Sequence, residues 1–351
     1  MGSGTRVTKG YFAAKPARSR KPREKFTTGA PADDRLVKLT ATGAMGQSGG
    51  VSDRRGPAAE TVAVIGAGSV GCMMAAHLAS AGCDIVVCGR APLDRVAMTI
   101  DGETIEHKVA WAVEPAELPP LRYAVLATKI HHTPDAGHWL AALPPDGVVI
   151  AAQNGVDHRA RIEPMTAAAV APMLVYPNSR RTGPGEVWVS RTGRGLVVPD
   201  DDAGRAVVAL FDGGGVEVEA VADFATAAWE KLLFNVIANP LTALTGRPLE
   251  VLSEPAVAAL GLELAFETVE VARAEGTTLT PRHARDALAW LQALPGHLSS
   301  SMHQDRAAGR TTEHEGLLGP VVALGERHGV PTPLSRAVLA LLDALPVGDG
   351  A

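Results

Sequence analysis

The sequence has few cysteines, few aromatic residues and no excess of positive charge. Only three cysteines, Cys72, Cys83 and Cys88, occur in 351 residues, too few for a disulfide framework and without metal-ligand spacing. Aromatic residues make up 4%, which argues against a nucleic-acid surface built by base stacking. The net charge of −5 gives no general attraction for polyanions. We therefore expect no metal, no nucleic-acid partner and a reducing, cytoplasmic location.

Long uninterrupted apolar runs are also missing, although 46% of the residues are hydrophobic and the length fits about two domains. The stretch 61–83 has no Asp, Glu, Lys or Arg, but four glycines interrupt it and its two ends differ in kind. The β-branched start TVAVIG is typical of a buried strand, and the Ala- and Met-rich remainder is typical of a helix. We therefore expect a strand, a glycine turn and a helix, and no membrane segment.

The first 60 residues differ in composition from the rest. They contain 12 Lys and Arg against 5 Asp and Glu, a net charge of +7, which leaves 21 against 33, a net −12, for residues 61–351. Residues 1–58 lack apolar periodicity, and we predict a disordered basic leader there. Three interpretations stay open: a non-native leader before a true start near Met45, a basic tail without a folded role, and a transit-type peptide.

A glycine-rich turn follows the first predicted strand. GAGSVG at 66–71 is a complete G-x-G-x-x-G between strand and helix, and DIVVCGR at 84–90 supplies the next strand. Gly66 permits the tight turn, Gly68 allows a pyrophosphate to approach the backbone, and Gly71 allows the helix to pack on the strand. We predict that the turn binds a dinucleotide at the helix N-terminus; the alternative is a turn that binds nothing. The predicted contacts are Gly66, Ala67, Gly68, Ser69, Val70 and Gly71.

Three further residues follow predicted strands of this half. The second strand ends at Arg90, where an acidic residue would select NAD; a guanidinium suits the 2′-phosphate of NADPH, unless Arg90 is a solvated surface residue. Lys129 and Asn154 end the next two strands, where ligands of open α/β sheets lie. Residues 168–199 look like a run of short strands, which we expect to extend the same sheet.

From about residue 222 the pattern becomes helical. In WEKLLFNVIANPLTAL at 229–244, Lys231, Asn235 and Asn239 recur every four residues on a helix that is otherwise mostly apolar. Buried polar side chains need partners, so the stripe is either the wall of a polar-ligand cavity or a solvated face. Pro240 frees one backbone carbonyl and favours a kink. Farther on, Ser301 with Gln304 is compatible with a capping box, and Glu313, His314 and Glu315 with a solvated face.

These motifs, in this order and spacing, resemble the ketopantoate reductase family (2-dehydropantoate 2-reductase) over residues 61–345. The segments that carry the resemblance are GAGSVG, Arg90, TK at 128–129, QNG at 153–155, RRTGPGEV at 180–187, the 229–244 segment and SSM…D…GR…TE at 300–313. The resemblance implies an α/β protein in which an N-terminal Rossmann-type dinucleotide-binding domain (59–221) precedes an all-helical C-terminal domain (222–346) like that of 6-phosphogluconate dehydrogenases. It also implies NADPH-dependent reduction of 2-dehydropantoate to pantoate, toward pantothenate and coenzyme A.

The resemblance also implies roles for individual residues. Lys231 matches the general acid that protonates the ketone oxygen, and Glu313 the acidic residue near that lysine and the cofactor. The substrate ligands are implied to be Asn235 and Asn239 for its oxygens, Ser301 for its carboxylate and Asn154 where cofactor and substrate meet, with Lys129 on the cofactor side. Burial lowers the pKa of a lysine and a nearby carboxylate raises it, and the sequence leaves open which prevails for Lys231.

Two positions depart from the family pattern. His131 and His132 stand where some members have a Gln, and Leu249 stands after Pro248 where some members have a polar substrate ligand. These departures bear on the substrate more than on the chemistry. Two alternatives therefore remain: a reductase of another branched 2-oxo acid, and an NADPH-binding sensor without turnover. Exposed faces of the helical half also make a homodimer possible.

Overall fold

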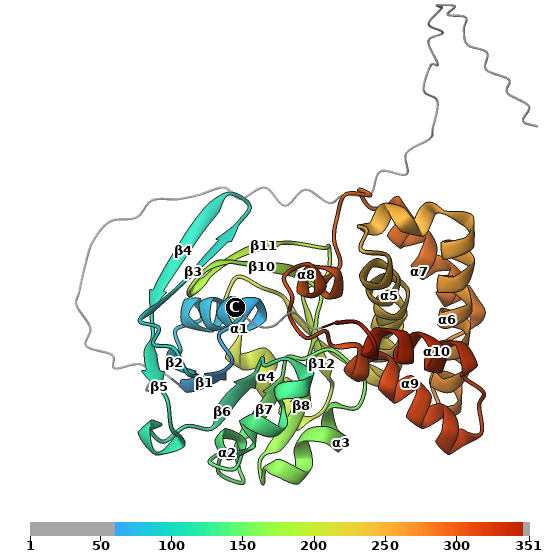
Figure 1. Ribbon diagram of the computed structural model, residues 1–351. Helices are drawn as coiled ribbons and strands as arrows, with labels where there is room; N and C mark the ends of the chain where they lie inside the picture. The colour runs from blue at the N-terminus through green and yellow to red at the C-terminus, as the bar shows by residue number, and fades with distance from the viewer. Residues whose placement is uncertain (1–59, 347–351) are drawn as a thin grey trace, which may run out of the picture. The chain divides into compact units, whose positions relative to one another are not determined.

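The computed structural model describes residues 60–346, which belong to one compact unit. The predicted basic leader, 1–58, lies outside the described residues. Strands and short helices occupy the chain up to Val221, and helices follow from Phe224 onward (Figure 1). None of the helices in the described part is long and apolar enough to cross a membrane.

A six-stranded parallel sheet forms the centre of the first half. Its order, β5-β2-β1-β6-β7-β8, places β1 in the middle, so that the chain crosses over after β5. Strands β1 and β7 are short, rich in β-branched residues and almost wholly buried, as expected of parallel strands that are covered on both faces. The strands of this sheet are β1 (Thr61–Ile65), β2 (Asp84–Cys88), β5 (Ala110–Ala112), β6 (Tyr123–Leu126), β7 (Val148–Ala151) and β8 (Ala169–Pro172).

Helices cover both faces of this sheet. Val62 and Val64 of β1 pack with α1 (Ser69–Ser80) and α4 (Asp202–Leu210) in one core cluster. The alternate residues Ala63 and Ile65 lie in a second cluster on the opposite face. There they pack with α2 (Gly137–Leu140) and α3 (His158–Ile162). This two-sided cover, with the glycine turn at the end of β1, is the arrangement expected for a Rossmann-type fold.

The expectation that residues 168–199 extend the central sheet is wrong for all but β8. The next strands form two smaller sheets, β10-β11-β3-β4 over α1 and β13-β12-β9 beside β8. For the sheet that contains β10 the reason is polarity, because β10 has the sequence NSRRTG, is largely exposed and cannot occupy a sheet that is buried on both faces. The strands are β3 (Arg95–Ile100), β4 (Glu103–Lys108), β9 (Leu174–Val175), β10 (Asn178–Gly183), β11 (Glu186–Ser190), β12 (Leu196–Pro199) and β13 (Val218–Val221).

The second half is built around one long helix, α5 (Phe224–Thr245). The side chain of Asp223 caps its N-terminus by accepting from the Thr226 N–H at 3.0 Å, and Gly246, with φ of 66°, ends it. The helix continues through Pro240 to Thr245. The helices around it are α6 (Pro255–Ala274), α7 (Pro281–Ala293), α8 (Ser301–Ala307), α9 (His314–His328) and α10 (Pro333–Asp343).

We predict that Gly71→Ala destabilises the fold. An added Cβ would lie 1.9 Å from the carbonyl oxygen of Gly66, so the helix and the turn would have to move apart. The free energy of unfolding in urea, measured without cofactor, should fall by roughly 1–3 kcal/mol. Gly68→Ala is the matched control, because its Cβ would meet nothing within 4 Å and its φ is −78°. Equal free energies of unfolding for the two variants would contradict the prediction.

Candidate active site

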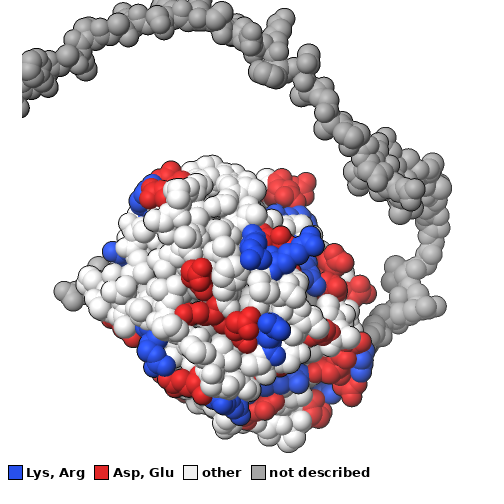
Figure 2. All heavy atoms as spheres, turned by 90° about the vertical axis from the view of Figure 1, so that its right-hand side faces the viewer, with Lys and Arg blue, Asp and Glu red and all other residues white. Residues whose placement is uncertain are grey.

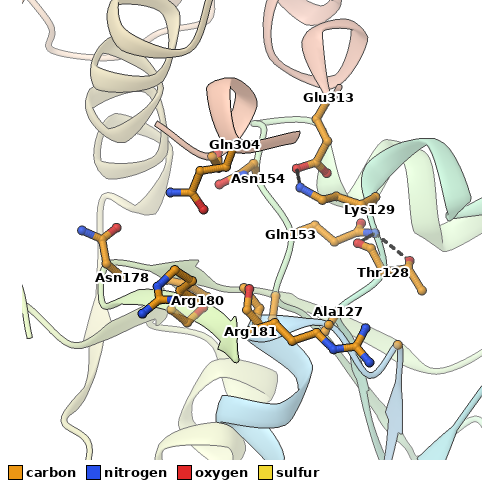
Figure 3. Close-up of a pocket in the computed structure, with 18 of the residues that line it drawn as sticks. Ala127, Thr128, Lys129, Gln153, Asn154, Asn178, Arg180, Arg181, Gln304 and Glu313 are labelled. Atoms are coloured by element: carbon orange, nitrogen blue, oxygen red, sulfur yellow. Dashed lines mark hydrogen bonds and ion pairs between the residues drawn. The ribbon is translucent and has the colours of Figure 1, made fainter. Parts of the chain in front are cut away.

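A large cavity separates the carboxyl ends of the parallel strands from α5 and α8. Its volume is about 1490 Å³, and both halves of the described chain line it (Figure 3). Pockets for a single small ligand are usually about 300–1,000 Å³. The cavity is therefore large enough for a dinucleotide and a small second ligand together.

The glycine turn borders this cavity and has the backbone geometry that a dinucleotide requires. Gly66 has a φ of 104°, and an added Cβ would lie 2.9 Å from the Thr128 nitrogen. Gly68 is the N-cap of α1, no side chain caps the helix there, and the space beside Gly68 is open. The free N–H groups and positive dipole end of α1 fit a pyrophosphate. Residues 66–70 line the cavity, whereas Gly71 packs α1 against the turn.

Three arginines bring positive charge to the cavity. Arg90 follows β2, as expected, and Arg180 and Arg181 project from β10 opposite Asn154 (Figure 3). Within the described chain, none of the three has a carboxylate within 4.0 Å, whereas Arg194, which also lines the cavity, pairs with Glu219 at 2.8 Å. The two β10 arginines belong to the RRTGPGEV motif, but no local pattern in the sequence gives them a role.

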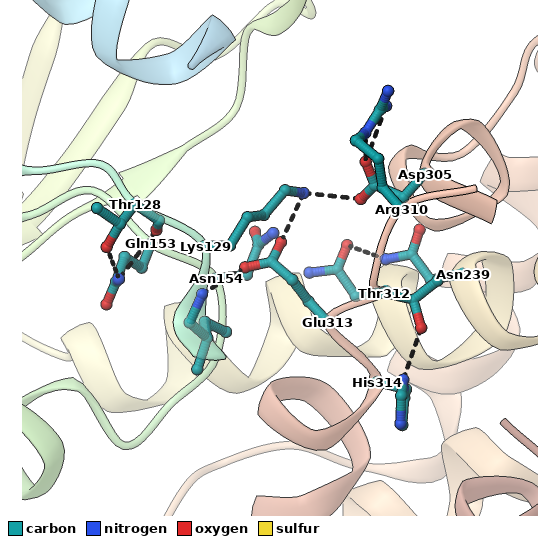
Figure 4. A network of polar contacts seen from close by, with 12 residues as sticks. Thr128, Lys129, Gln153, Asn154, Asn239, Asp305, Arg310, Thr312, Glu313 and His314 are labelled. Atoms are coloured by element: carbon teal, nitrogen blue, oxygen red, sulfur yellow. Dashed lines mark hydrogen bonds and ion pairs between the residues drawn. The ribbon is translucent and has the colours of Figure 1, made fainter. Parts of the chain in front are cut away.

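A charged network joins the two sides of the cavity. The Nζ of Lys129, which follows β6, lies 2.8 Å from Oδ2 of Asp305 and 3.1 Å from Oε2 of Glu313 (Figure 4). Arg310 completes the network at 3.0 Å from the other oxygen of Asp305. Burial lowers the pKa of the Lys129 ammonium, but the two carboxylates outweigh it and raise the pKa above its ordinary value. Lys129 is therefore held as a cation between the two halves.

Glu313 does not belong to a solvated face. It is 8% exposed, and its Oε1 accepts a hydrogen bond from the Ile130 N–H at 2.8 Å while Oε2 binds Lys129. The neighbouring His314 contacts Asp343 at 2.7 Å, and with Glu315 these residues place three ligand-type atoms within 4.8 Å of one another. No local sequence pattern reveals this group, because Asp343 is 29 residues from His314.

Lys231 lies inside the cavity with its charge poorly compensated. Its Nζ donates to Oδ1 of Asn154 at 3.1 Å, which connects α5 to the loop after β7. Burial lowers the pKa of the Lys231 ammonium to about 8, against the opposing influence of the Glu313 carboxylate. The sequence left open whether burial or a nearby carboxylate prevails in the pKa of Lys231, and in the structure burial prevails. A lysine with this pKa releases and regains a proton near neutral pH.

The polar stripe of α5 faces the cavity, so the alternative of a solvated face is wrong. Asn235 and Asn239 line the cavity with Lys231, and Nδ2 of Asn239 lies 3.4 Å from Oδ1 of Asn235. Asn239 is only 4% exposed. Their amides therefore form a polar strip beside the lysine.

Ser301 also lines the cavity, but the capping-box interpretation is displaced by one residue. The N-cap of α8 is Ser300, whose hydroxyl accepts from the His303 N–H at 3.1 Å. Ser301 is the first residue of the helix and exposed. Its hydroxyl is therefore not used as the cap.

Hydrogen bonds to α3 and to the loop after β6 fix the loop that carries Asn154. The amide of Gln153 donates to the Thr128 carbonyl at 2.9 Å, and the Nε2 of His158 lies 2.9 Å from the Gln153 carbonyl. A carbonyl only accepts, so His158 Nε2 carries the proton. Burial lowers the pKa of His158 to about 4, which keeps the ring neutral. No sequence pattern indicates this role for His158, since a lone histidine carries no recognisable signal.

This combination of fold and site defines a class of protein. A parallel sheet with a glycine turn at the cavity edge, at which a helix begins, is typical of proteins that bind a nicotinamide or flavin dinucleotide. A buried lysine of lowered pKa opposite that turn, among amide side chains, is built for proton transfer to a small polar ligand. The chain is a dinucleotide-dependent oxidoreductase.

Comparison with known proteins specifies the family. Residues 62–200 match the family described as ketopantoate reductase PanE/ApbA, and residues 223–346 match its C-terminal part. The chain belongs to this ketopantoate reductase family. Its relatives include the 2-dehydropantoate 2-reductases of Caulobacter vibrioides, 34% identical over 81% of this chain and 98% of that protein, and of Mycobacterium tuberculosis, 33% identical over 82% and 99%.

Solved structures agree with this assignment. The crystal structure of a PanE/ApbA family ketopantoate reductase from Ralstonia eutropha JMP134 matches with a TM-score of 0.73 at 30% identity. The match covers 81% of this chain and 97% of that one. The predicted fold class, a Rossmann-type half followed by a helical half, is therefore confirmed.

We predict that Asp305→Asn weakens the connection between the halves. The substitution leaves Lys129 with one carboxylate and Arg310 with none at 3.0 Å, in a partly buried network. The free energy of unfolding in urea should fall by about 1–3 kcal/mol, less than for a fully buried pair because Lys129 is partly exposed. Glu326→Gln, which removes the exposed pair with Arg336, is the control and should cost under about 1 kcal/mol. Equal losses would mean that the network contributes no more than a surface pair.

Proposed function

We propose that this protein catalyses the NADPH-dependent reduction of 2-dehydropantoate to pantoate, a step toward pantothenate and coenzyme A. The observation that carries the proposal is Lys231, whose pKa is about 8 and whose Nζ lies beside Asn154, in a cavity bordered by the glycine turn. Two relatives at 34% and 33% identity, covered over nearly their whole length, are 2-dehydropantoate 2-reductases. We also propose that the protein is located in the cytoplasm.

The reaction follows from the arrangement of the side chains. A nicotinamide dinucleotide, when bound at the glycine turn, would supply the hydride for the carbonyl carbon of a 2-oxo acid, and negative charge would then develop on the former ketone oxygen. The Lys231 ammonium donates a proton to that oxygen, and Asn154 orients the amine through the 3.1 Å hydrogen bond. The Glu313 carboxylate opposes the effect of burial on the pKa of Lys231, and a pKa of about 8 leaves the ammonium mostly protonated at neutral pH. Asn235 and Asn239 bind oxygens of the substrate.

Binding of two anionic ligands relies on cations and N–H groups of the cavity. The N–H groups at Gly68 receive the pyrophosphate, and Arg90 receives the 2′-phosphate that distinguishes NADPH from NADH. Ser301 receives the substrate carboxylate with its free hydroxyl. Lys129 acts on the cofactor side of the cavity.

We also propose that two copies of the chain associate through their helical halves to form a homodimer. The face that the helical half presents in Figure 2 carries a broad area with neither acidic nor basic side chains, next to interspersed charges of both signs. Leu341 of α10 is an apolar side chain that is 58% exposed. Exposed apolar side chains on this half, such as Leu341, favour association with a second copy of the chain.

We predict that purified protein oxidises NADPH when 2-dehydropantoate is added, and that Lys231→Ala lowers kcat by about 10²–10⁴ with little change in NADPH affinity. The pH profile gives a second measurement. The protonated lysine is the active form and its pKa is lowered to about 8, so kcat should be constant below pH 7 and fall above about pH 8. Unchanged turnover in Lys231→Ala would remove Lys231 from the mechanism, and NADPH binding without turnover by the unmodified protein would favour a sensor.

We predict that Arg90→Asp shifts cofactor preference from NADPH toward NADH. The variant loses a charge-assisted contact with the 2′-phosphate and gains a repulsive one, so the ratio of kcat/KM for NADPH to that for NADH should fall by about 100-fold or more. Arg327→Asp is the control, since Arg327 is exposed on α9 and does not line the cavity. An equal loss with both cofactors would place the 2′-phosphate elsewhere.

A further inference from the structure

Two neighbouring arginines of β10 line the cavity, and the reaction proposed for this protein uses neither of them. Successive side chains of a strand point to opposite faces of its sheet, so Arg180 and Arg181 have different surroundings. Arg180 pairs across the strands with Trp188 of β11, and its guanidinium carbon lies 5.9 Å from the centroid of that ring. Arg180 thus lies with the exposed Trp188 on the outer face of the sheet.

Arg181 lies on the face of the sheet that covers α1. Its partner across the strands is Val187, and directly opposed residues of antiparallel strands share a face. Val187 is buried and packs in the same core cluster as Met73 of α1. Strand β10 is also in contact with α1. The cation of Arg181 is therefore placed beside this helix.

The Arg181 guanidinium lies near the N-terminal end of α1. Burial raises the pKa of the Cys72 thiol to about 11, and the charge of Arg181 acts on this thiol in the opposite direction. The Sγ of Cys72 lies 3.6 Å from the carbonyl oxygen of Ala67, in the glycine turn. Figure 3 shows the Arg181 side chain extended toward the part of the cavity that Ala127 borders, and a Cβ on Gly71 would lie 3.4 Å from Ala127.

The charge of Arg181 is not compensated by any carboxylate within 4.0 Å among residues 60–346. Glu186 of the neighbouring strand is already paired with Arg95 at 2.9 Å. The Nε of Arg181 donates to the Gly183 carbonyl at 3.1 Å. The N–H groups of its terminal nitrogens can therefore contact an anion in the cavity.

Two phosphate positions of a dinucleotide have to be told apart here. The 2′-phosphate is expected at the end of β2, where Arg90 lies. The pyrophosphate is expected at the N-terminus of α1, where Gly68 caps the helix without a side-chain hydrogen bond. Arg181 comes from the sheet that covers α1 and so lies on the pyrophosphate side.

We propose that Arg181 is a further cofactor-binding residue, whose guanidinium contacts the pyrophosphate that the N–H groups of α1 receive. The inference rests on the proposed function, because it requires a bound dinucleotide. A guanidinium contacts two phosphate oxygens at once through its planar fork of donors. NADPH and NADH share the pyrophosphate, so Arg181 contributes affinity for both cofactors, whereas Arg90 selects between them.

Arg181→Gln tests this assignment by equilibrium binding. The dissociation constants of NADPH, NADH and ADP-ribose are measured by calorimetry; ADP-ribose has the pyrophosphate but neither the 2′-phosphate nor the nicotinamide. We expect Kd to rise by about tenfold for all three ligands, because a charge-assisted contact is lost. Arg181→Lys keeps the charge without the fork, so Kd should rise less. Arg327→Gln, on exposed α9 and away from the cavity, is the control and should leave Kd unchanged.

Three outcomes would contradict the assignment. A rise in Kd for NADPH alone would place Arg181 at the 2′-phosphate, and an unchanged Kd for all three ligands would remove Arg181 from the cofactor site. Either result overturns the inference and leaves the proposed function intact. If the unmodified chain binds neither NADPH nor NADH, the proposed function fails and the inference with it. Arg181 is exposed, and circular dichroism checks that Arg181→Gln folds; if it does not, the same titrations of Arg181→Lys decide.

Discussion

The buried carboxylate of Glu313 is the group on which the rest of the site depends. It accepts the Ile130 N–H and binds the Lys129 ammonium, and through these contacts it joins the helical half to the loop after β6. The same charge acts on Lys231, where it opposes but does not cancel the effect of burial. One carboxylate thus contributes both to the closure of the cavity and to the protonation state of the lysine inside it.

For ligand binding, the charged groups around the cavity matter more than the net charge of the chain. Residues 61–351 carry a net charge of −12, although the ligands that we propose for the cavity are anions. Binding must therefore come from groups that face the cavity: the free N–H groups of α1, the arginines without carboxylate partners, and Lys231. Glu313 faces the cavity but is buried and paired with Lys129, so its charge is neutralised where the ligands would bind.

The sequence by itself determined the glycine turn, the position of Arg90 and the polar stripe of α5, because each is a short-range pattern whose meaning depends on strand or helix periodicity. It did not determine the separate sheet of β10, the displaced cap at Ser300 or the network of Lys129 with Asp305 and Glu313. Those partners lie 176 and 184 residues from Lys129 in the chain. Only the tertiary structure decided the pKa of Lys231 as well, because burial and a distant carboxylate act in opposite directions and their balance depends on distances that no local pattern contains.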